Sequence, residues 1–250
     1  MQIYSNKYCL ITSYYNYGGG QPSLDSIKYK LNYDGSINDL YINFDNTFDP
    51  WHKEHLKVGC SGRKDLIYGK IFLLKNFIVN NIQNKYKFLC HIDYSDVKFA
   101  RSFKDMMIKF ENSNLDFCIA TEKSCWPYLE IVQQWTDKKL LETEFYYINS
   151  GCIISKIEIF LNYLDKLINL CLNTNIDFWD DQGVWQYYNN AIEPLNSDRI
   201  CEYFFCTALL DNTYYSIDNN QIKTKFNTYP YIIHDNSSFS LNLINNIPGK

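Results

Sequence analysis

Two aspartates three residues apart follow a short apolar segment near the middle of the chain. Residues 88–92 form this segment, and Asp93 and Asp96 come directly after it. An apolar run of this length predicts a buried strand rather than a helix. Side chains at the carboxyl end of such a strand lie at the sheet edge where α/β proteins bind ligands. Two converging carboxylates there suit a hard divalent cation, which can hold phosphates; the alternative is a solvated turn in which both aspartates cap a helix.

A second polar segment, Asn149-Ser150-Gly151, interrupts the apolar run over residues 145–154. An asparagine amide can both donate to and accept from a sugar hydroxyl. Glycine lets a ligand approach the backbone of a strand. The interruption therefore indicates a ligand-facing strand, and the alternative is a β-bulge with Asn149 on its rim.

Further candidates each have a structural alternative. The segment Asp180-Asp181-Gln182 opens a predicted helix, where acidic residues are also favoured by capping and by the helix dipole. His234 ends the last predicted strand, and a lone histidine is more often structural than a ligand. Lys70 lies on an amphipathic helix, either on a solvated face or as a cation near a diphosphate. His52 and His55 could share a helix face and bind a metal, but no third ligand is near, which favours a polar surface.

The elements that must position these residues follow from the apolar periodicity. The sequence predicts strands at 8–13, 39–44, 88–92, 115–120, 145–154, 203–206, 208–211 and 229–236, and helices at 66–82, 103–110, 157–172 and about 180–188. Strands that alternate with helices favour an α/β sandwich, and no repeat or low-complexity linker divides the chain. The segment Gly18-Gly19-Gly20 fits neither GxGxxG nor a P-loop, so no phosphate-binding loop is predicted.

Composition limits the class of protein. The 250 residues are 46% hydrophobic and 21% charged, which is ordinary for a soluble globular protein. The net charge of −4, without a long basic run, argues against a nucleic-acid partner. The nine cysteines include no CxxC pair, so a structural zinc site is not expected, and Cys90, Cys118 and Cys152 are predicted to be reduced core residues.

The first residues lack the apolar core of a signal peptide, and no stretch reaches transmembrane length. These features predict a cytoplasmic protein without a membrane span. For a viral protein, the location would be the host cytoplasm or the virion.

The polar segments, taken in chain order, resemble one family. The set comprises Asp93-Tyr94-Ser95-Asp96, Cys125-Trp126-Pro127, Asn149-Ser150-Gly151-Cys152-Ile153-Ile154, Asp180-Asp181-Gln182 and Ile232-Ile233-His234-Asp235-Asn236. It resembles the glycosyltransferase domain of the procollagen lysyl hydroxylases, and it is similar, more distantly, to the glycogenin-like retaining glycosyltransferases. The resemblance runs from Tyr8 to the C-terminus and is thin before Gly69.

The resemblance implies a GT-A fold, an α/β class with a Rossmann-like mixed sheet flanked by helices, formed by residues 1–250 as one domain. It implies Mn²⁺ and UDP-glucose as the donor substrate. By match to the family motifs, the metal ligands would be Asp93, Asp96 and His234; the sugar-facing catalytic group would be Asn149, Asp180, Asp181 and Gln182; and the cofactor-binding group would be Thr12, Ser13, Tyr94, Trp126 and Asn236. Lys70 joins the cofactor-binding group as a candidate cation near the diphosphate. Asp181 would orient hydroxyls of donor or acceptor, and Gln182 would support an oxocarbenium-like transition state.

The reaction implied is transfer of glucose, with retention, to galactosyl-hydroxylysine of a collagen-like protein through an α-1,2 bond. Alternatives are a galactosyltransferase acting on hydroxylysine, a transferase with another glycan acceptor, and an inactive sugar-nucleotide or glycan-binding module. The chain departs from the family in the metal motif, where the tyrosine is at Tyr94, one position early. It also departs at Asp235, Ser237 and Ser240, where the family has two glycines and a lysine. Lys70 or Arg63 could replace that lysine.

Overall fold

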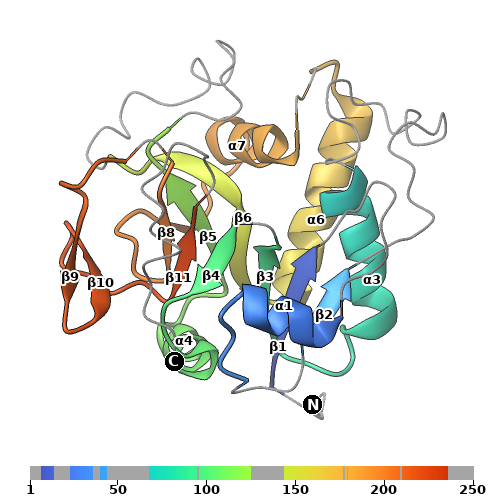
Figure 1. Cartoon of the computed structure of the whole chain (residues 1–250). Helices are drawn as coiled ribbons and strands as arrows, with labels where there is room; N and C mark the ends of the chain where they lie inside the picture. The colour runs from blue at the N-terminus through green and yellow to red at the C-terminus, as the bar shows by residue number, and fades with distance from the viewer. Residues whose placement is uncertain are drawn as a thin grey trace.

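A six-stranded mixed sheet forms the centre of the protein (Figure 1). The computed structural model describes residues 7–13, 23–35, 40–43, 68–94, 96–124, 144–176, 178, 180–208 and 210–235. The strands, in spatial order, are β2 (Leu40–Asn43), β1 (Tyr8–Ser13), β3 (Phe88–Asp93), β6 (Tyr147–Lys156), β5 (Phe117–Glu122) and β7 (Ser197–Asp198).

Strand direction decides which chain ends meet at the edge of this sheet. β1 runs parallel to β2 and β3, whereas β6 is antiparallel to both β3 and β5. The carboxyl ends of β1, β3 and β5 therefore lie at the same edge as the beginning of β6. This edge collects Ser13, Asp93, Glu122 and Asn149.

The remaining strands form two smaller sheets. β4 (Val97–Phe99) pairs antiparallel with β11 (Ile232–His234), which pairs parallel with β8 (Phe204–Cys206). β9 (Tyr215–Asp218) and β10 (Gln221–Thr224) form a separate antiparallel hairpin.

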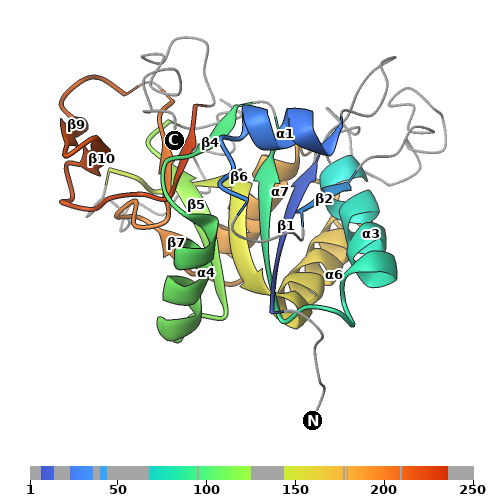
Figure 2. The ribbon, with the colours of Figure 1, turned by 60° about the horizontal axis from the view of Figure 1, so that its bottom comes forward.

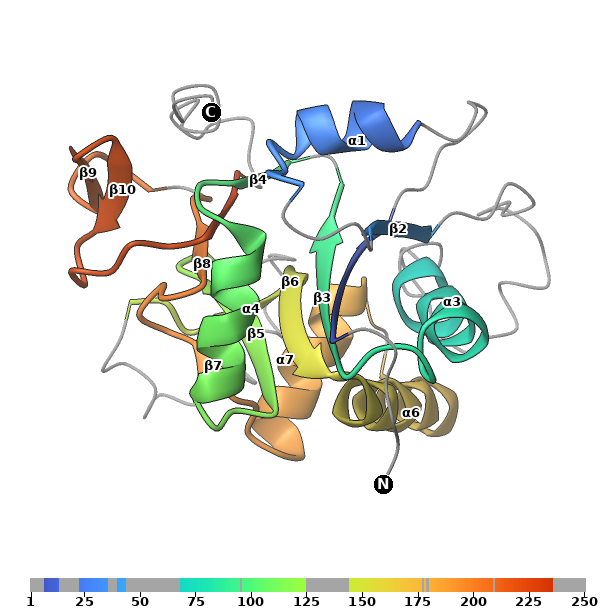
Figure 3. The same cartoon turned by 90° about the horizontal axis from the view of Figure 1, so that it is seen from below.

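Helices cover both faces of the central sheet, as Figures 2 and 3 show. One face packs against η2 (Tyr68–Leu73), a π-helix that continues into α3 (Leu74–Asn81), and against α6 (Ile157–Asn173) and α7 (Asp181–Ala191). The other face packs against α1 (Leu24–Lys30), α4 (Phe103–Asn112) and the three-stranded sheet. In β3, Leu89 packs on the first side, and Cys90 and Ile92 pack on the second. A strand buried on both faces is apolar throughout, which is the pattern of residues 88–92.

The predicted fold class is confirmed. The sequence analysis did not predict α1, β4, β7, β9 and β10, and the elements that it did predict differ from the structure in two places. Residues 208–211 were predicted as a strand, which is wrong: the amide of Leu210 donates to the Thr207 carbonyl in a turn, and Asp211 accepts from the Thr213 amide. The helix predicted over 66–82 begins as a π-helix, and its first two positions lie outside the described residues. Cys90, Cys118 and Cys152 are free and buried, as predicted. Among the described residues, no helix has the length and apolar character needed to cross a membrane.

Candidate active site

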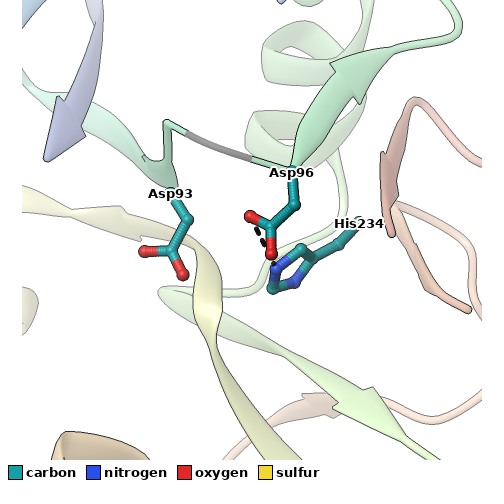
Figure 4. A group of neighbouring side chains, drawn as sticks. All are labelled: Asp93, Asp96 and His234. Atoms are coloured by element: carbon teal, nitrogen blue, oxygen red, sulfur yellow. Dashed lines mark ion pairs between the residues drawn. The ribbon is translucent and has the colours of Figure 1, made fainter. Parts of the chain in front are cut away.

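Asp93, Asp96 and His234 converge at the edge of the central sheet (Figure 4). Asp93 ends β3, and Asp96 directly precedes β4. The register of β4 and β11 places His234 opposite Val97, and the Asp235 amide donates to the Asp96 carbonyl at 2.8 Å. One ligand atom from each of the three side chains lies within 4.8 Å of the others. His234, which follows Asp96 by 138 positions in the sequence, thus joins the two aspartates in one cluster of metal-type ligands.

The cluster fits the divalent cation that the resemblance implies. Two carboxylates and an imidazole are a suitable donor set for Mn²⁺. His234 is 2% exposed, and its Nε2 atom has no hydrogen-bond partner, although Asp96 Oδ1 lies 3.4 Å away. A buried polar atom without a partner is costly. A cation at Nε2 would remove that cost.

Electrostatics of His234 are set by two opposing effects. Burial alone would lower the pKa of the imidazole, but the negative charge of Asp96 and contacts with Cys152 and Cys206 outweigh it, so the pKa lies well above its ordinary value. A metal that binds Nε2 must therefore compete with a proton.

Lys70 joins the cluster to helix α7. Its Nζ lies 2.8 Å and 2.9 Å from the two carboxylate oxygens of Asp93, and 3.8 Å from Asp181 Oδ2. The lysine side chain is only 14% exposed, so the interpretation of Lys70 as part of a solvated face is wrong. The π-helical turn that carries Lys70 directs it toward the sheet edge; such turns are frequent at functional sites.

The two aspartates at the start of α7 have different surroundings. Asp180 is the N-cap, and its Oδ1 accepts from the Gly183 amide at 2.9 Å, as its capping alternative predicts. Asp181 is 2% exposed, and its Oδ2 has no hydrogen-bond partner. Burial raises the pKa of Asp181 to about 6, against the lowering effect of Lys70. Asp181 is thus a desolvated carboxylate beside Lys70.

A bulge in β6 presents Asn149. Ile119 of β5 pairs with Ile153, but the next residue, Ala120, pairs with Asn149, so three residues of β6 have no counterpart on β5. Asn149 Oδ1 accepts from the Gly151 amide at 2.9 Å and lies 3.0 Å from His234 Nδ1. The bulge alternative for this segment is thus confirmed, and the bulge places Asn149 beside the metal-type cluster.

Glu122 is a site residue that the sequence analysis missed. It ends β5, is fully buried, and accepts hydrogen bonds from Asn149 Nδ2 at 3.3 Å and from Gln182 Nε2. Gln182 Oε1 in turn accepts from the Ser150 amide at 3.4 Å. An acidic residue at the end of a buried apolar strand is the same pattern that marked Asp93, so it could have been found.

The end of β1 lies beside the cluster. Ser13 pairs in register with Asp93, and its Oγ is 2.8 Å from Nε2 of the buried His91. Burial lowers the pKa of His91 to about 4, so its ring is neutral. Thr12 is fully buried, and its hydroxyl has no hydrogen-bond partner.

Of the remaining predicted site residues, only Tyr94 lies in the part of the chain that the structure describes. Tyr94 is half-buried and packs against the apolar core on the α4 side. Trp126 and Asn236 lie outside the described residues, as do His52, His55, Arg63 and the glycine triplet.

Comparison with solved structures identifies the fold as that of GT-A glycosyltransferases. WbbM, a bifunctional glycosyltransferase, superposes with a TM-score of 0.51 at 11% identity over 95% of this chain and 47% of its own. A glycosyltransferase involved in glycosylation of the major capsid of PBCV-1 gives a TM-score of 0.46 at 8% identity, over 93% of this chain and 95% of that one. Mouse xyloside xylosyltransferase 1 gives a TM-score of 0.48 at 12% identity, over 94% of this chain and 99% of that one. No protein-family model and no curated protein matches the sequence.

Proposed function

We propose that this chain, as one domain over residues 1–250, is a metal-dependent retaining glycosyltransferase that uses a nucleotide-sugar donor. The observation that carries the proposal is the convergence of Asp93, Asp96 and His234 at the carboxyl edge of a GT-A sheet. Lys70 and Asp181 adjoin this cluster on one side, and Asn149 on the other.

The cluster and Lys70 form the diphosphate side of the site. Asp93, Asp96 and His234 would hold Mn²⁺, which when bound neutralises the donor phosphates and assists their departure. Lys70 supplies a second positive charge within reach of the same groups. A chain with a net charge of −4 needs such local cations to bind an anionic donor.

The start of α7 and the bulge of β6 form the sugar side. At neutral pH most Asp181 side chains are ionised, since the pKa is about 6, and Oδ2 accepts a hydrogen bond from a donor or acceptor hydroxyl. Asn149 and Gln182, whose amides are held by Glu122, face the sugar. We expect the acceptor hydroxyl to attack the anomeric carbon of the sugar on the same face from which the diphosphate leaves. The configuration at that carbon is then retained.

The nucleoside end lies toward β1 in this proposal. Ser13 is beside Asp93 in the sheet, and the sheet continues from there to β1 and β2, away from the sugar side. Thr12 and Ser13 would therefore lie near the uridine. Tyr94, which packs against the apolar core on the α4 side, does not support base stacking.

The finer specificity rests on the resemblance of motifs. We propose UDP-glucose as donor and galactosyl-hydroxylysine of a collagen-like protein as acceptor. Transfer from UDP-galactose to hydroxylysine, or to a different glycan, is the competing specificity.

Donor hydrolysis with Mn²⁺ and UDP-glucose, UDP-galactose or UDP-N-acetylglucosamine tests the donor, and transfer to a galactosyl-hydroxylysine peptide tests the acceptor. Faster turnover of UDP-glucose with product on the peptide supports the proposal. Equal turnover of all three donors contradicts the glucose assignment. UDP binding that needs no Mn²⁺, with no turnover, indicates a binding module instead.

A further inference from the structure

The fully buried Glu122 sits between two amide side chains at the end of β5. One carboxylate oxygen accepts from Asn149 Nδ2 at 3.3 Å, and the other accepts from Gln182 Nε2. Both oxygens accept, which is the behaviour of a carboxylate. A carboxylate buried at 0% exposure is costly unless hydrogen bonds compensate it, so these contacts hold both amides firmly.

Glu122 and Gly151 together allow only one orientation of the Asn149 amide. The Gly151 N–H donates to Asn149 Oδ1 at 2.9 Å, while Glu122 takes the NH₂ group. If the amide were reversed, its NH₂ would face another N–H donor, and its oxygen would face a carboxylate. A donor on one side and an acceptor on the other thus fix the oxygen of Asn149 toward His234.

This orientation determines which nitrogen of His234 carries a proton. Nδ1 lies 3.0 Å from Asn149 Oδ1, an oxygen that can only accept, so Nδ1 must donate. Once the imidazole gives up its other proton, the free lone pair is on Nε2, the atom that faces Asp96. Outer hydrogen bonds of this kind typically alter metal affinity by about 10–100-fold.

We propose that Glu122 is a positioning residue that sets the tautomer of His234 through Asn149, and thereby the affinity of the Asp93–Asp96–His234 cluster for a divalent cation. This inference rests on the metal site of the proposed function. The same carboxylate also accepts a hydrogen bond from Gln182, so Glu122 contacts residues on both the metal side and the sugar side of the site.

Titration of Mn²⁺ into the purified chain, followed by calorimetry, tests the proposal. Glu122→Gln keeps the shape, but its amide can accept only one of the two hydrogen bonds, so we expect Mn²⁺ affinity to fall about tenfold. Glu111→Gln is the matched control: Glu111 lies on α4 near Lys7 and Tyr8, at the opposite end of the sheet, and its loss should leave affinity within twofold.

The double variant Glu122→Gln/Asn149→Asp restores the pattern of donors and acceptors. The new glutamine donates to the new carboxylate and accepts from Gln182, and the new carboxylate accepts from His234 Nδ1 and Gly151. We expect its Mn²⁺ affinity to return to within about threefold of the unsubstituted chain. Affinity that stays unchanged in Glu122→Gln, or that falls further in the double variant, overturns the proposal.

A spectrum of the unsubstituted chain gives a test that needs no variant to fold. In long-range ¹H–¹⁵N correlations of the Zn²⁺-loaded chain, which has four histidines, we expect His234 to carry its proton on Nδ1 and to bind through Nε2. Binding through Nδ1 overturns the inference but leaves the metal site intact. Failure of the unsubstituted chain to bind Mn²⁺ or Zn²⁺ overturns the metal site itself.

Discussion

Gly151 and His234 approach so closely that no side chain fits between them. A Cβ atom on Gly151 would lie 2.3 Å from Cε1 of the buried His234 ring, and 2.9 Å from Asp93 Oδ2. The bulge of β6 thus forms the floor of the metal-type cluster, and a glycine is needed there because two of the ligands occupy the space of its side chain.

Gly151→Ala should therefore displace His234. Because the ring is buried, we expect Mn²⁺ affinity to fall at least tenfold and the free energy of unfolding to fall by about 1–3 kcal/mol, as for other overpacked sites. Calorimetric titration and urea unfolding measure both. Normal Mn²⁺ affinity in this variant would contradict the placement of His234 against β6.

Lys70→Met removes the positive charge beside Asp93. We expect Mn²⁺ to bind several-fold more tightly without nucleotide, because a competing cation is lost, while donor hydrolysis falls at least about tenfold. Lys75→Met is the control, since Lys75 pairs with Asp165 on the surface between α3 and α6. Equal effects of the two substitutions would argue against a role for Lys70 at the site.

Asp181→Asn should abolish transfer activity and raise the free energy of unfolding. The folded pKa of about 6 lies above the ordinary 3.8, so the native state binds more protons than the unfolded state between these values. Stability of the unsubstituted chain therefore declines as pH rises from about 4 to 6, and the variant lacks this decline. The stability gain of the variant should grow by about 2 kcal/mol over that range and then level off, while transfer is lost.

Urea unfolding at several pH values measures this difference. Asp165→Asn is the matched control, because it makes the same substitution at a side chain that is 51% exposed. A stability difference that is constant between pH 4 and pH 7 would rule out the desolvated state of Asp181.

Metal binding should release a proton. The pKa of His234 lies well above its ordinary value, so a proton competes with the cation for Nε2. We expect Mn²⁺ affinity to rise with pH until the pKa of His234 is passed. Calorimetry in buffers of different ionisation enthalpy measures the protons released per ion at each pH; Mn²⁺ affinity and proton release that do not change with pH would contradict Nε2 as a ligand.

Local sequence patterns were sufficient for the α/β class and for singling out most of the candidate site residues, and the resemblance of the ordered motifs supplied their predicted roles. Asp93 was found because it follows an apolar strand, and Asn149 because it interrupts one. A polar residue at such a position is unusual and indicates a functional or structural role. The contact between His234 and Asp96 depends on pairing of β11 with β4, and no local pattern encodes pairing between such distant segments. It became predictable only through resemblance of the ordered motifs.

Other relationships were not accessible from sequence. Lys70 has the spacing of a solvated helix face, and only the π-helical turn and the packing of η2 bring it to Asp93. Glu122 carries the same strand-end pattern as Asp93, but its role depends on the two amides from β6 and α7 that meet it in space.

In the proposed site, Asp93, Asp96 and His234 bind one cation that holds the donor diphosphate. A crystal structure of the chain with Mn²⁺ and UDP, with anomalous data collected at the manganese edge, shows whether they do. We expect one anomalous peak bound by a carboxylate oxygen of Asp93, one of Asp96 and Nε2 of His234, with the UDP phosphates on the open side. A peak elsewhere, or UDP bound without manganese at these residues, would contradict it.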